Sequence, residues 1–169
     1  MWIRSVTRED LQAVHELLVA TWHATYDEVY GAQKVDGITG RWHSVEALKR
    51  NLAKPYSEFV VADDGADILG VAYASQKDHK LSLLHQLYVH PEHQGKGVGS
   101  LLLAEMESAF PGVYTLQLEV IEANEKACRF YESRGFARTG AVIENWGEPD
   151  SQISVLVLEK PLIGYELAP

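Results

Sequence analysis

The sequence predicts an α/β fold in which helices cover the faces of a mixed sheet, and three observations carry this prediction. The 169 residues are 46% hydrophobic and 23% charged, which suits one domain with a single buried core. Apolar residues recur three and four apart in some segments and alternate in others. These segments follow one another as strand, two helices, three strands, helix, strand, helix and two strands. A pure helical bundle or a pure β-sandwich does not have this order.

The N-terminal segment predicts a short strand and then a helix. Residues 3–5 form the strand, and Thr7 with Asp10 three residues later resembles a capping box with the shorter acid. A helix is therefore expected to start at this pair and to fray near Tyr26. Its apolar face consists of residues spaced three and four apart, namely Leu11, Val14, Leu17, Leu18 and Trp22.

The next segment, residues 27–41, has no regular pattern and is punctuated by glycines. Ser44 then caps a second, short helix that ends before Pro55. Two strands are expected over 59–62 and 68–74, and an Asp-Asp-Gly turn between them predicts a hairpin.

The C-terminal half predicts strands that alternate with two helices. Pro91 closes the first of these strands, and Gly135 ends the second helix as a C-terminal glycine. The expected elements are strand 81–89, helix 97–110, strand 114–120, helix 124–134, strand 137–143 and strand 153–158.

Composition and charge exclude several classes of protein. The chain has 15 Lys and Arg against 24 Asp and Glu, a net charge of -9, so a nucleic-acid partner is not expected and a small cationic partner is favoured. No apolar run approaches the roughly 20 residues of a membrane span, so no membrane partner is expected. The N-terminus has no secretory pattern, and Cys128 is the single cysteine, which together favour a cytoplasmic location.

The most informative segment runs from Val89 to Ser100, where a strand leads through a glycine-rich turn into an amphipathic helix. Glycines let backbone N–H groups converge and the helix N-terminus adds partial positive charge, so this segment predicts an anion site. Lys96 adds a full charge nearby. The Walker spacing is absent, because no glycine stands five residues before Gly95. The dinucleotide spacing is absent as well, because the glycines read G-x-G-x-G and occur late in the chain.

Two ordered blocks of sequence carry a family resemblance. Residues 94–99 read Gln-Gly-Lys-Gly-Val-Gly and follow the strand end 87–91, while residues 124–136 form a second block. They resemble the Q/R-x-x-G-x-G/A signature and the N-x-x-A-x-x-F-Y-x-x-x-G-F pattern of the GNAT superfamily of acetyl-CoA-dependent N-acetyltransferases. The resemblance implies one GNAT-type domain over residues 1–169, with a central mixed, mostly antiparallel sheet flanked by helices. It also implies acetyl-CoA as co-substrate and no metal.

The resemblance assigns the coenzyme site to the strand end, the loop and the first helical turn. Backbone amides from Gly95 to Ser100 are expected to hold the pyrophosphate, and Gln94 to shape the start of the loop. The backbone of 87–89 is expected to pair with the pantetheine arm and to polarise the acetyl carbonyl. Asn124 caps its helix, binds the coenzyme, or does both. The expected coenzyme-binding residues are Leu87, Tyr88, Val89, Gln94, Gly95, Lys96, Gly97, Val98, Gly99, Ser100 and Asn124.

Tyr131 is the expected general acid, because the matching tyrosine of the family protonates the departing thiolate. Its phenol stays protonated at neutral pH, although an aromatic pair with Phe130 that anchors the helix is the structural alternative. The glutamate that many relatives carry before the glycine loop is missing here. His85 is the expected base, with Glu119 and Glu122 as rivals.

The N-terminal region supplies the expected acceptor site. The stretch 21–26 resembles a GNAT subgroup that includes polyamine acetyltransferases, and its aromatic residues line the acceptor or pack in the core. The acids of this region steer an ammonium or merely keep the surface soluble. The expected acceptor-binding residues are Trp22, Tyr26, Asp27 and Glu28, with Asp36 nearby. The expected acceptor is a small-molecule or peptide amine that is cationic at neutral pH.

Several alternatives stay open at this level. A non-catalytic acyl-CoA-binding or sensory module of the same fold is the rival from another class, and another acyl donor such as succinyl-CoA is not excluded. A homodimer is common in the family and is an open alternative for this chain. Four histidines between His79 and His93 match no compact ligand spacing, so no metal site is expected there.

Overall fold

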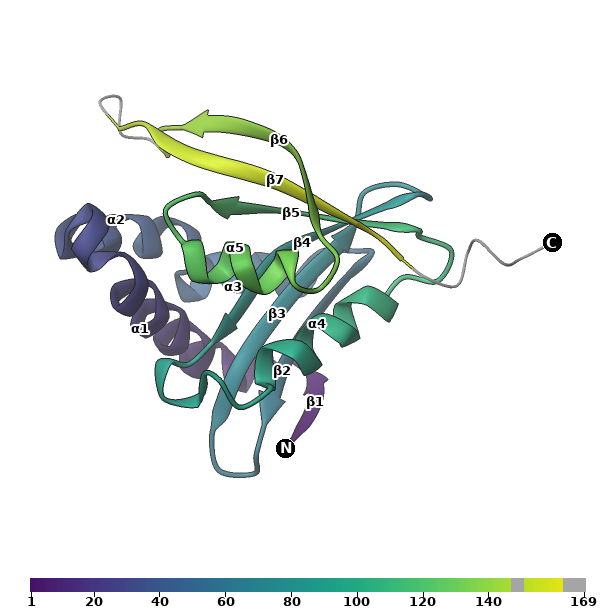
Figure 1. The fold of residues 1–169 in the computed structure, drawn as a ribbon. Helices are drawn as coiled ribbons and strands as arrows, with labels where there is room; N and C mark the ends of the chain where they lie inside the picture. Colours follow the sequence, from purple (N-terminus) through teal and green to yellow (C-terminus); the bar gives the residue numbers. More distant parts are fainter. Residues whose placement is uncertain (147–150, 163–169) are drawn as a thin grey trace. The chain divides into compact units, whose positions relative to one another are not determined.

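The secondary structure alternates in the way that the sequence predicts, except near the N-terminus. The computed structural model describes residues 1–146 and 151–162 (Figure 1). The strands in this part of the chain are β1 (Trp2–Ser5), β2 (Ser57–Asp63), β3 (Ile68–Gln76), β4 (Leu81–Val89), β5 (Thr115–Ile121), β6 (Ala137–Glu144) and β7 (Ile153–Pro161). The helices are η1 (Arg8–Asp10), α1 (Leu11–Tyr30), α2 (Ala32–Trp42), α3 (Val45–Ala53), η2 (Pro91–His93), α4 (Val98–Ser108) and α5 (Glu125–Glu132).

The described strands form one mixed sheet of seven in the order β1-β2-β3-β4-β5-β7-β6. β4 and β5 are parallel, whereas β1 with β2, β2 with β3, β5 with β7 and β6 with β7 are antiparallel. The mixed, mostly antiparallel sheet flanked by helices is thus confirmed. The chain divides into a first unit, residues 1–75 with 86–109, and a second unit, residues 76–85 with 110–169, and each is described by itself.

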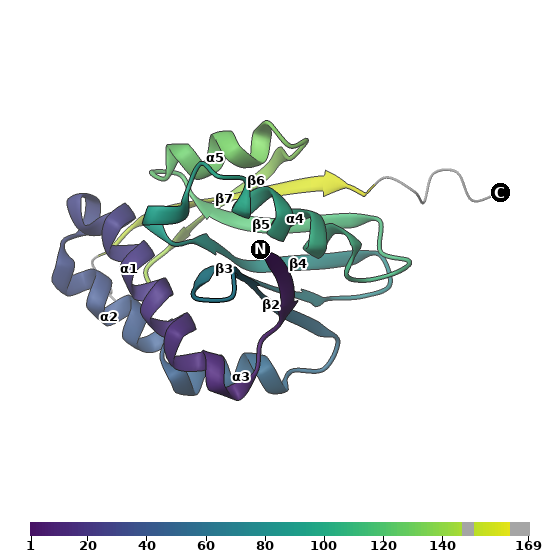
Figure 2. The ribbon, with the colours of Figure 1, turned by 90° about the horizontal axis from the view of Figure 1, so that it is seen from below.

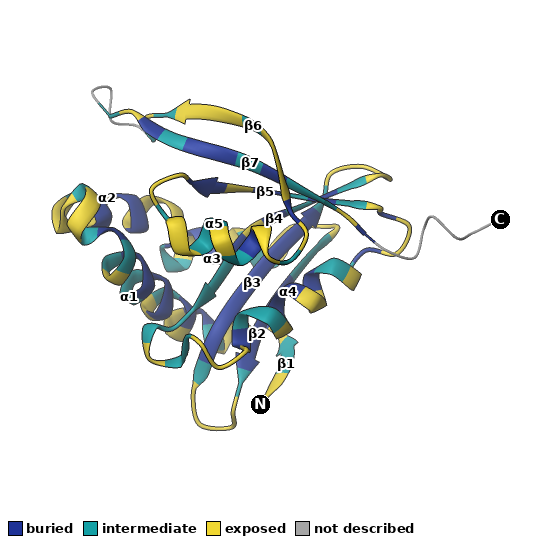
Figure 3. Cartoon of the chain, in the orientation of Figure 1, coloured by how far each residue is buried: buried dark blue, intermediate teal, exposed yellow. Residues whose placement is uncertain are grey.

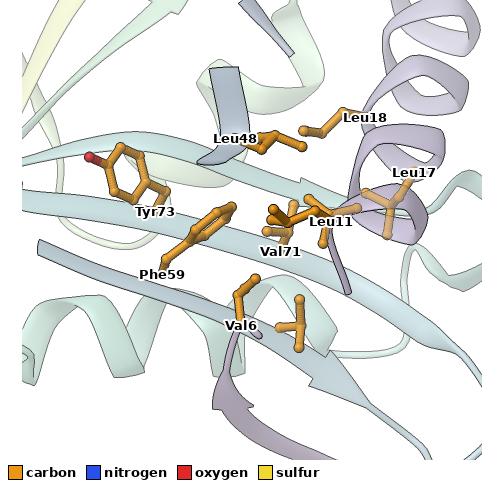
Figure 4. Close-up of a cluster of buried hydrophobic side chains, with 10 residues drawn as sticks. Val6, Leu11, Leu17, Leu18, Leu48, Phe59, Val71 and Tyr73 are labelled. Atoms are coloured by element: carbon orange, nitrogen blue, oxygen red, sulfur yellow. The ribbon is translucent and has the colours of Figure 1, made fainter. Parts of the chain in front are cut away.

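The core of the first unit lies between α1, α3 and the strands β2 and β3. Successive residues of β3 point to opposite faces of the sheet, so Val71 and Tyr73 join the cluster under α1 (Figure 4). The residues of this cluster are Val6, Leu11, Val14, Leu17, Leu18, Leu48, Phe59, Val61, Val71 and Tyr73. Figure 2 shows α1 and α3 on one side of these strands and α4 on the other.

Gly70 lets α4 approach the opposite face of β3 closely. A Cβ atom at Gly70 would lie 2.8 Å from Leu102 Cδ1 and 2.9 Å from the Tyr88 carbonyl oxygen. Neither distance is tolerated between non-bonded atoms, so the residue must lack a side chain. This packing fixes α4, whose first turn follows the glycine loop, against the sheet.

The start of α1 is held by an ion-pair network that the capping-box pattern only partly predicts. The Asp10 carboxylate accepts from the Thr7 backbone N–H at 2.8 Å, as the pattern implies. It also accepts two hydrogen bonds from Arg4, at 2.8 and 2.9 Å. Because of the bonds from Arg4 above all, the pKa of Asp10 falls from 3.8 to about 2.

Asp10→Asn should therefore destabilise the fold by about 1–2 kcal/mol near neutral pH. A carboxyl with a lowered folded-state pKa stabilises above its unfolded value, and this stabilisation is lost as pH falls from about 4 toward 2. Thermal unfolding of both proteins between pH 2 and 7 checks this, with the exposed neighbour Glu9→Gln as control. A difference from wild type that stays constant down to pH 2 would contradict the assignment.

The segment 27–41, which the sequence leaves irregular, is helical. α1 continues past Tyr26 to Tyr30, and α2 follows after Gly31, so three α-helices rather than two precede β2. Gly31 has a φ of 85°, which suits the break between the helices. The glycines inside α2 cost about 1 kcal/mol each relative to alanine. Burial of Val35 and Ile38 offsets that cost, and a short sequence window does not reveal such burial.

The second unit agrees with the sequence prediction element by element. Its strand order is β4-β5-β7-β6, and β7 pairs with both neighbours over most of its length. Gly135 has a φ of 94° after α5, as a helix-ending glycine requires. β6 is largely exposed (Figure 3).

Within the described ranges 1–146 and 151–162, none of the helices combines the length and the apolar character needed to cross a bilayer.

Candidate active site

The glycine loop joins β4 to α4 in the first unit. β4 ends at Val89, η2 turns the chain, and the Gln94 Nε2 donates to the Val89 carbonyl at 3.0 Å. This bond ties the loop to the strand end. Gly95 and Gly97 then adopt φ values of 76° and 85°, in the left-handed region that favours glycine.

The loop places open space at the N-terminus of α4. Gly97 is the N-cap residue and has no side chain with which to cap the first helical amides. A Cβ atom built on Gly95 or Gly97 would meet no other atom within 4 Å. Lys96 is exposed, with its Nζ donating to the Glu92 carbonyl at 3.1 Å. A helix N-terminus, two bare glycines and an adjacent ammonium fit the pyrophosphate of coenzyme A.

The end of β4 extends beyond its ladder with β5. The parallel register covers Leu81 to Leu84, whereas the strand continues to Val89. On the β3 side, the His90 N–H donates to the Leu69 carbonyl at 2.9 Å. The stretch Leu87 to Val89 is therefore extended backbone outside the β5 register, as pairing with a pantetheine arm requires.

An aromatic cluster surrounds Trp22 in the first unit. The Trp22 ring centroid lies 4.7 Å from Tyr26, 5.6 Å from His43 and 6.5 Å from Tyr88. Burial lowers the pKa of His43 to about 4, so its ring is neutral at physiological pH. Burial likewise raises the pKa of Tyr88 to about 12. Both packing and acceptor binding remain compatible with this arrangement of Trp22 and Tyr26.

Gln86 is a member of this cluster that sequence reasoning did not select. Its Nε2 lies 3.5 Å from His43 Nδ1, and its Oε1 is buried without a hydrogen-bond partner among the described residues. The only sequence signal is the alternation of β4, which puts residue 86 on the same buried face as Leu84, where a polar residue is unusual. Trp42, the neighbour of His43 in the sequence, is not part of the core, because it is 55% exposed.

The acids expected near the acceptor site are brought together by a histidine. On α1, the Nδ1 atom of His23 lies 2.6 Å from Asp27 Oδ1. The Nε2 atom of the same ring lies 2.8 Å from Asp36 Oδ1. Asp36 belongs to α2, so this cluster links two helices. Glu28 is exposed on α1. The structure thus groups Asp27 with Asp36 around His23, and Glu28 takes part in neither of these two bonds.

The second unit holds the expected general acid on α5. Tyr131 is buried, with its ring centroid 5.2 Å from Phe130 and 5.4 Å from Phe136. Asn124 caps α5 by accepting from the Ala127 N–H at 3.1 Å, which leaves a coenzyme contact as a prediction. Burial and then the charges of Glu132 and Glu122 raise the pKa of the Cys128 thiol, so this thiol is not activated as a nucleophile.

The three base candidates all lie in the second unit and are all exposed. His85 follows Leu84 and Glu119 follows Leu118, the last pair in the parallel β4–β5 register. Glu122 accepts from the Ser154 hydroxyl at 2.6 Å. His85 and Glu119 are exposed, and contact of either side chain with a substrate is still a prediction.

One potential ligand group lies beside the glycine loop, although the histidine spacing matches no motif. His90, Glu92 and His93 each offer one ligand atom, and these atoms lie within 4.8 Å of one another. All three residues are at least partly exposed. Their nearness follows from η2, a turn that brings residues two and three apart together.

Comparisons with known proteins identify relatives of this chain. The model of the acetyltransferase (GNAT) family matches residues 11–136. The N-alpha-acetyltransferase RimI of Mycobacterium tuberculosis is 36% identical over 98 residues, which cover 56% of this chain and 61% of that protein. The spermidine N(1)-acetyltransferase of Thermoplasma acidophilum is 27% identical over 140 residues, which cover 79% of this chain and 86% of that protein.

Solved structures share the fold over nearly the full chain. The PaiA N-acetyltransferase of Thermoplasma acidophilum, in complex with coenzyme A, matches with a TM-score of 0.80 and 23% identity, over 95% of this chain and 98% of that chain. The ribosomal-protein-S18-alanine N-acetyltransferase of Escherichia coli matches with a TM-score of 0.74 and 20% identity, over 99% of both chains. At these identities, the likeness shows the fold.

Proposed function

Because this chain belongs to the acetyltransferase (GNAT) family, we propose that it acetylates the primary amine of a small cationic acceptor. Family membership makes it an acetyl-CoA-dependent acyltransferase, with acetyl-CoA as the co-substrate. The observation that carries the proposal is the glycine loop: its N-cap residue Gly97 provides no side chain to cap α4, and a Cβ atom there would meet open space. Such a site suits the coenzyme's pyrophosphate.

The proposed reaction is direct attack of the neutral amine on the thioester carbonyl. A C–N bond forms, the C–S bond breaks, and the amine loses a proton to a base. A backbone N–H near the end of β4 stabilises the developing oxyanion, a contribution of about 2.7–4 kcal/mol. Tyr131 donates its phenolic proton to the leaving thiolate, and His85 is the proposed base. No covalent acyl-enzyme is needed, which agrees with the raised pKa of Cys128.

The charge of the chain supports a cationic acceptor. The net charge is -9, and Asp27, Glu28 and Asp36 lie on neighbouring helices. On the same helices, Lys34 Nζ lies 5.3 Å from the centroid of the Tyr30 ring, so an aromatic ring there already contacts an ammonium. One relative is a spermidine acetyltransferase, which adds polyamines to the candidates. The RimI relative adds peptide N-termini, although the match covers 61% of that protein.

We expect spermidine and diamines to be acetylated faster than neutral or anionic amines at matched ionic strength. Free thiol release from acetyl-CoA measures turnover over a panel that also holds aminoglycosides, amino-acid amides and N-terminal peptides. Succinyl-CoA in place of acetyl-CoA tests the donor. If acetyl-CoA binds but none of the amines in the panel leads to thiol release, the result would instead favour a non-catalytic acyl-CoA-binding module.

Charge reversal tests the steering part of the proposal. Asp27→Lys and Glu28→Lys should each raise KM for a cationic acceptor about two- to fivefold, because exposed ion pairs contribute about 0.2–1 kcal/mol. Asp67→Lys, at an exposed site in the β2–β3 turn, changes the net charge equally and serves as control. If all three variants raise KM equally, the overall charge of the protein is responsible. If none of them changes KM, the steering argument is wrong.

A further inference from the structure

His23 occupies a position from which it bonds two carboxylates at once. Its Nδ1 lies 2.6 Å from Asp27 Oδ1, and its Nε2 lies 2.8 Å from Asp36 Oδ1. An ionised carboxylate only accepts hydrogen bonds, and a neutral imidazole has only one N–H. Both bonds form together only when the ring carries two protons. The geometry therefore corresponds to an imidazolium held between two aspartates.

The protonation of His23 changes the charge that the cluster presents to solvent. With the imidazolium in place, the three side chains sum to one negative charge, and with neutral His23 they sum to two. The Asp27 and Asp36 side chains are 39% and 69% exposed, so a dissolved cation reaches both.

The surroundings of His23 favour the charged form. The charged groups that bond its ring are Asp27 on its own helix and Asp36 on α2, the helix packed against it. The bond with Asp27 is the largest influence and raises the pKa of His23 above 6.5; burial opposes this rise, and Asp36 adds to it. The ring therefore keeps its proton to a higher pH than an unperturbed imidazole does.

We propose that His23 sets the affinity of the acidic pair Asp27 and Asp36 for a cationic acceptor. This inference rests on the proposed function for its substrate class. A protonated His23 competes with the acceptor's ammonium for the same carboxylates. A neutral His23 leaves both carboxylates to the acceptor, so acceptor binding strengthens as pH rises.

The protonation of His23 is measured directly by NMR of the imidazole nitrogens between pH 5 and 9. His23 should titrate above 6.5 in wild type, and Asp36→Asn should lower its pKa. Glu28→Gln removes a charge from the same helix without touching either bond and should shift it less. A midpoint at or below 6.5, or equal shifts in both variants, would overturn the bridge whatever the enzyme acetylates.

The effect on the acceptor is tested with spermidine as probe, by kinetics and by calorimetry with coenzyme A in place of acetyl-CoA. KM and Kd of wild type should fall about two- to fivefold as His23 deprotonates, which corresponds to an exposed ion pair. His23→Gln should keep the low value at every pH, and His23→Arg the high value. The kcat ratio between the variants should stay constant with pH, which separates binding from amine deprotonation.

These readouts distinguish the inference from the proposed function. If spermidine binds but is not acetylated, the proposed acceptor is wrong while the pH dependence of Kd still tests His23. If wild type and both variants bind spermidine with the same pH dependence, His23 does not set the affinity for the acceptor. The NMR titration stands apart from turnover in either case.

Discussion

Tyr131→Phe should lower kcat by about 10²- to 10⁴-fold, the contribution of a positioned general acid. The thiolate leaves without its proton donor in this variant, so the interaction that is lost exists chiefly in the transition state. The substitution keeps the ring that packs 5.4 Å from Phe136, so the fold of the second unit should survive. Acetyl-CoA affinity should change little.

The control for this variant is Tyr114→Phe, which removes a phenol from an exposed tyrosine of the same unit. Its turnover should equal that of wild type. Turnover must be measured in the pre-steady state, so that chemistry rather than product release is observed. A Tyr131→Phe enzyme with undiminished chemistry would make Tyr131 an aromatic anchor of α5, the alternative that its burial between Phe130 and Phe136 keeps open.

Elements with local punctuation could be predicted from the sequence, and α2 could not. Pro91 and Gly135 end their elements through backbone constraints that act within one or two residues. The strand 81–89 was accordingly predicted with the bounds that the structure gives. In α2 the glycines argue against a helix, and the burial of Val35 and Ile38 that overrides them depends on tertiary packing.

The site divides in the same way between local and distant information. The loop from Gln94 to Ser100 carries its chemistry in consecutive residues, so a sequence pattern is sufficient to find it. The pairing of Gln86 with His43 joins residues 43 positions apart, and His23 with Asp36 joins residues on two helices. No periodicity connects such residues. Their roles emerge only when the chain is folded.

Gly97→Leu should weaken coenzyme binding by roughly ten- to a hundredfold, the effect of losing one hydrogen bond to a charged phosphate at about 1.5–3 kcal/mol. The leucine side chain would enter the open space at the N-terminus of α4, where the structure places no other atom within 4 Å of a Cβ. Calorimetry with coenzyme A measures the affinity, and circular dichroism reports the fold.

Backbone strain must be separated from the loss of the phosphate space, because Gly97 has a φ of 85° and any side chain there costs about 1–2 kcal/mol of stability. Gly112→Leu is the matched control, since Gly112 has a φ of 90° and open space around its Cβ but lies in the turn before β5. Both variants should lose similar stability, and only Gly97→Leu should lose affinity. Equal affinities in the two variants would place the pyrophosphate elsewhere, because strain alone would then account for every effect of the substitution.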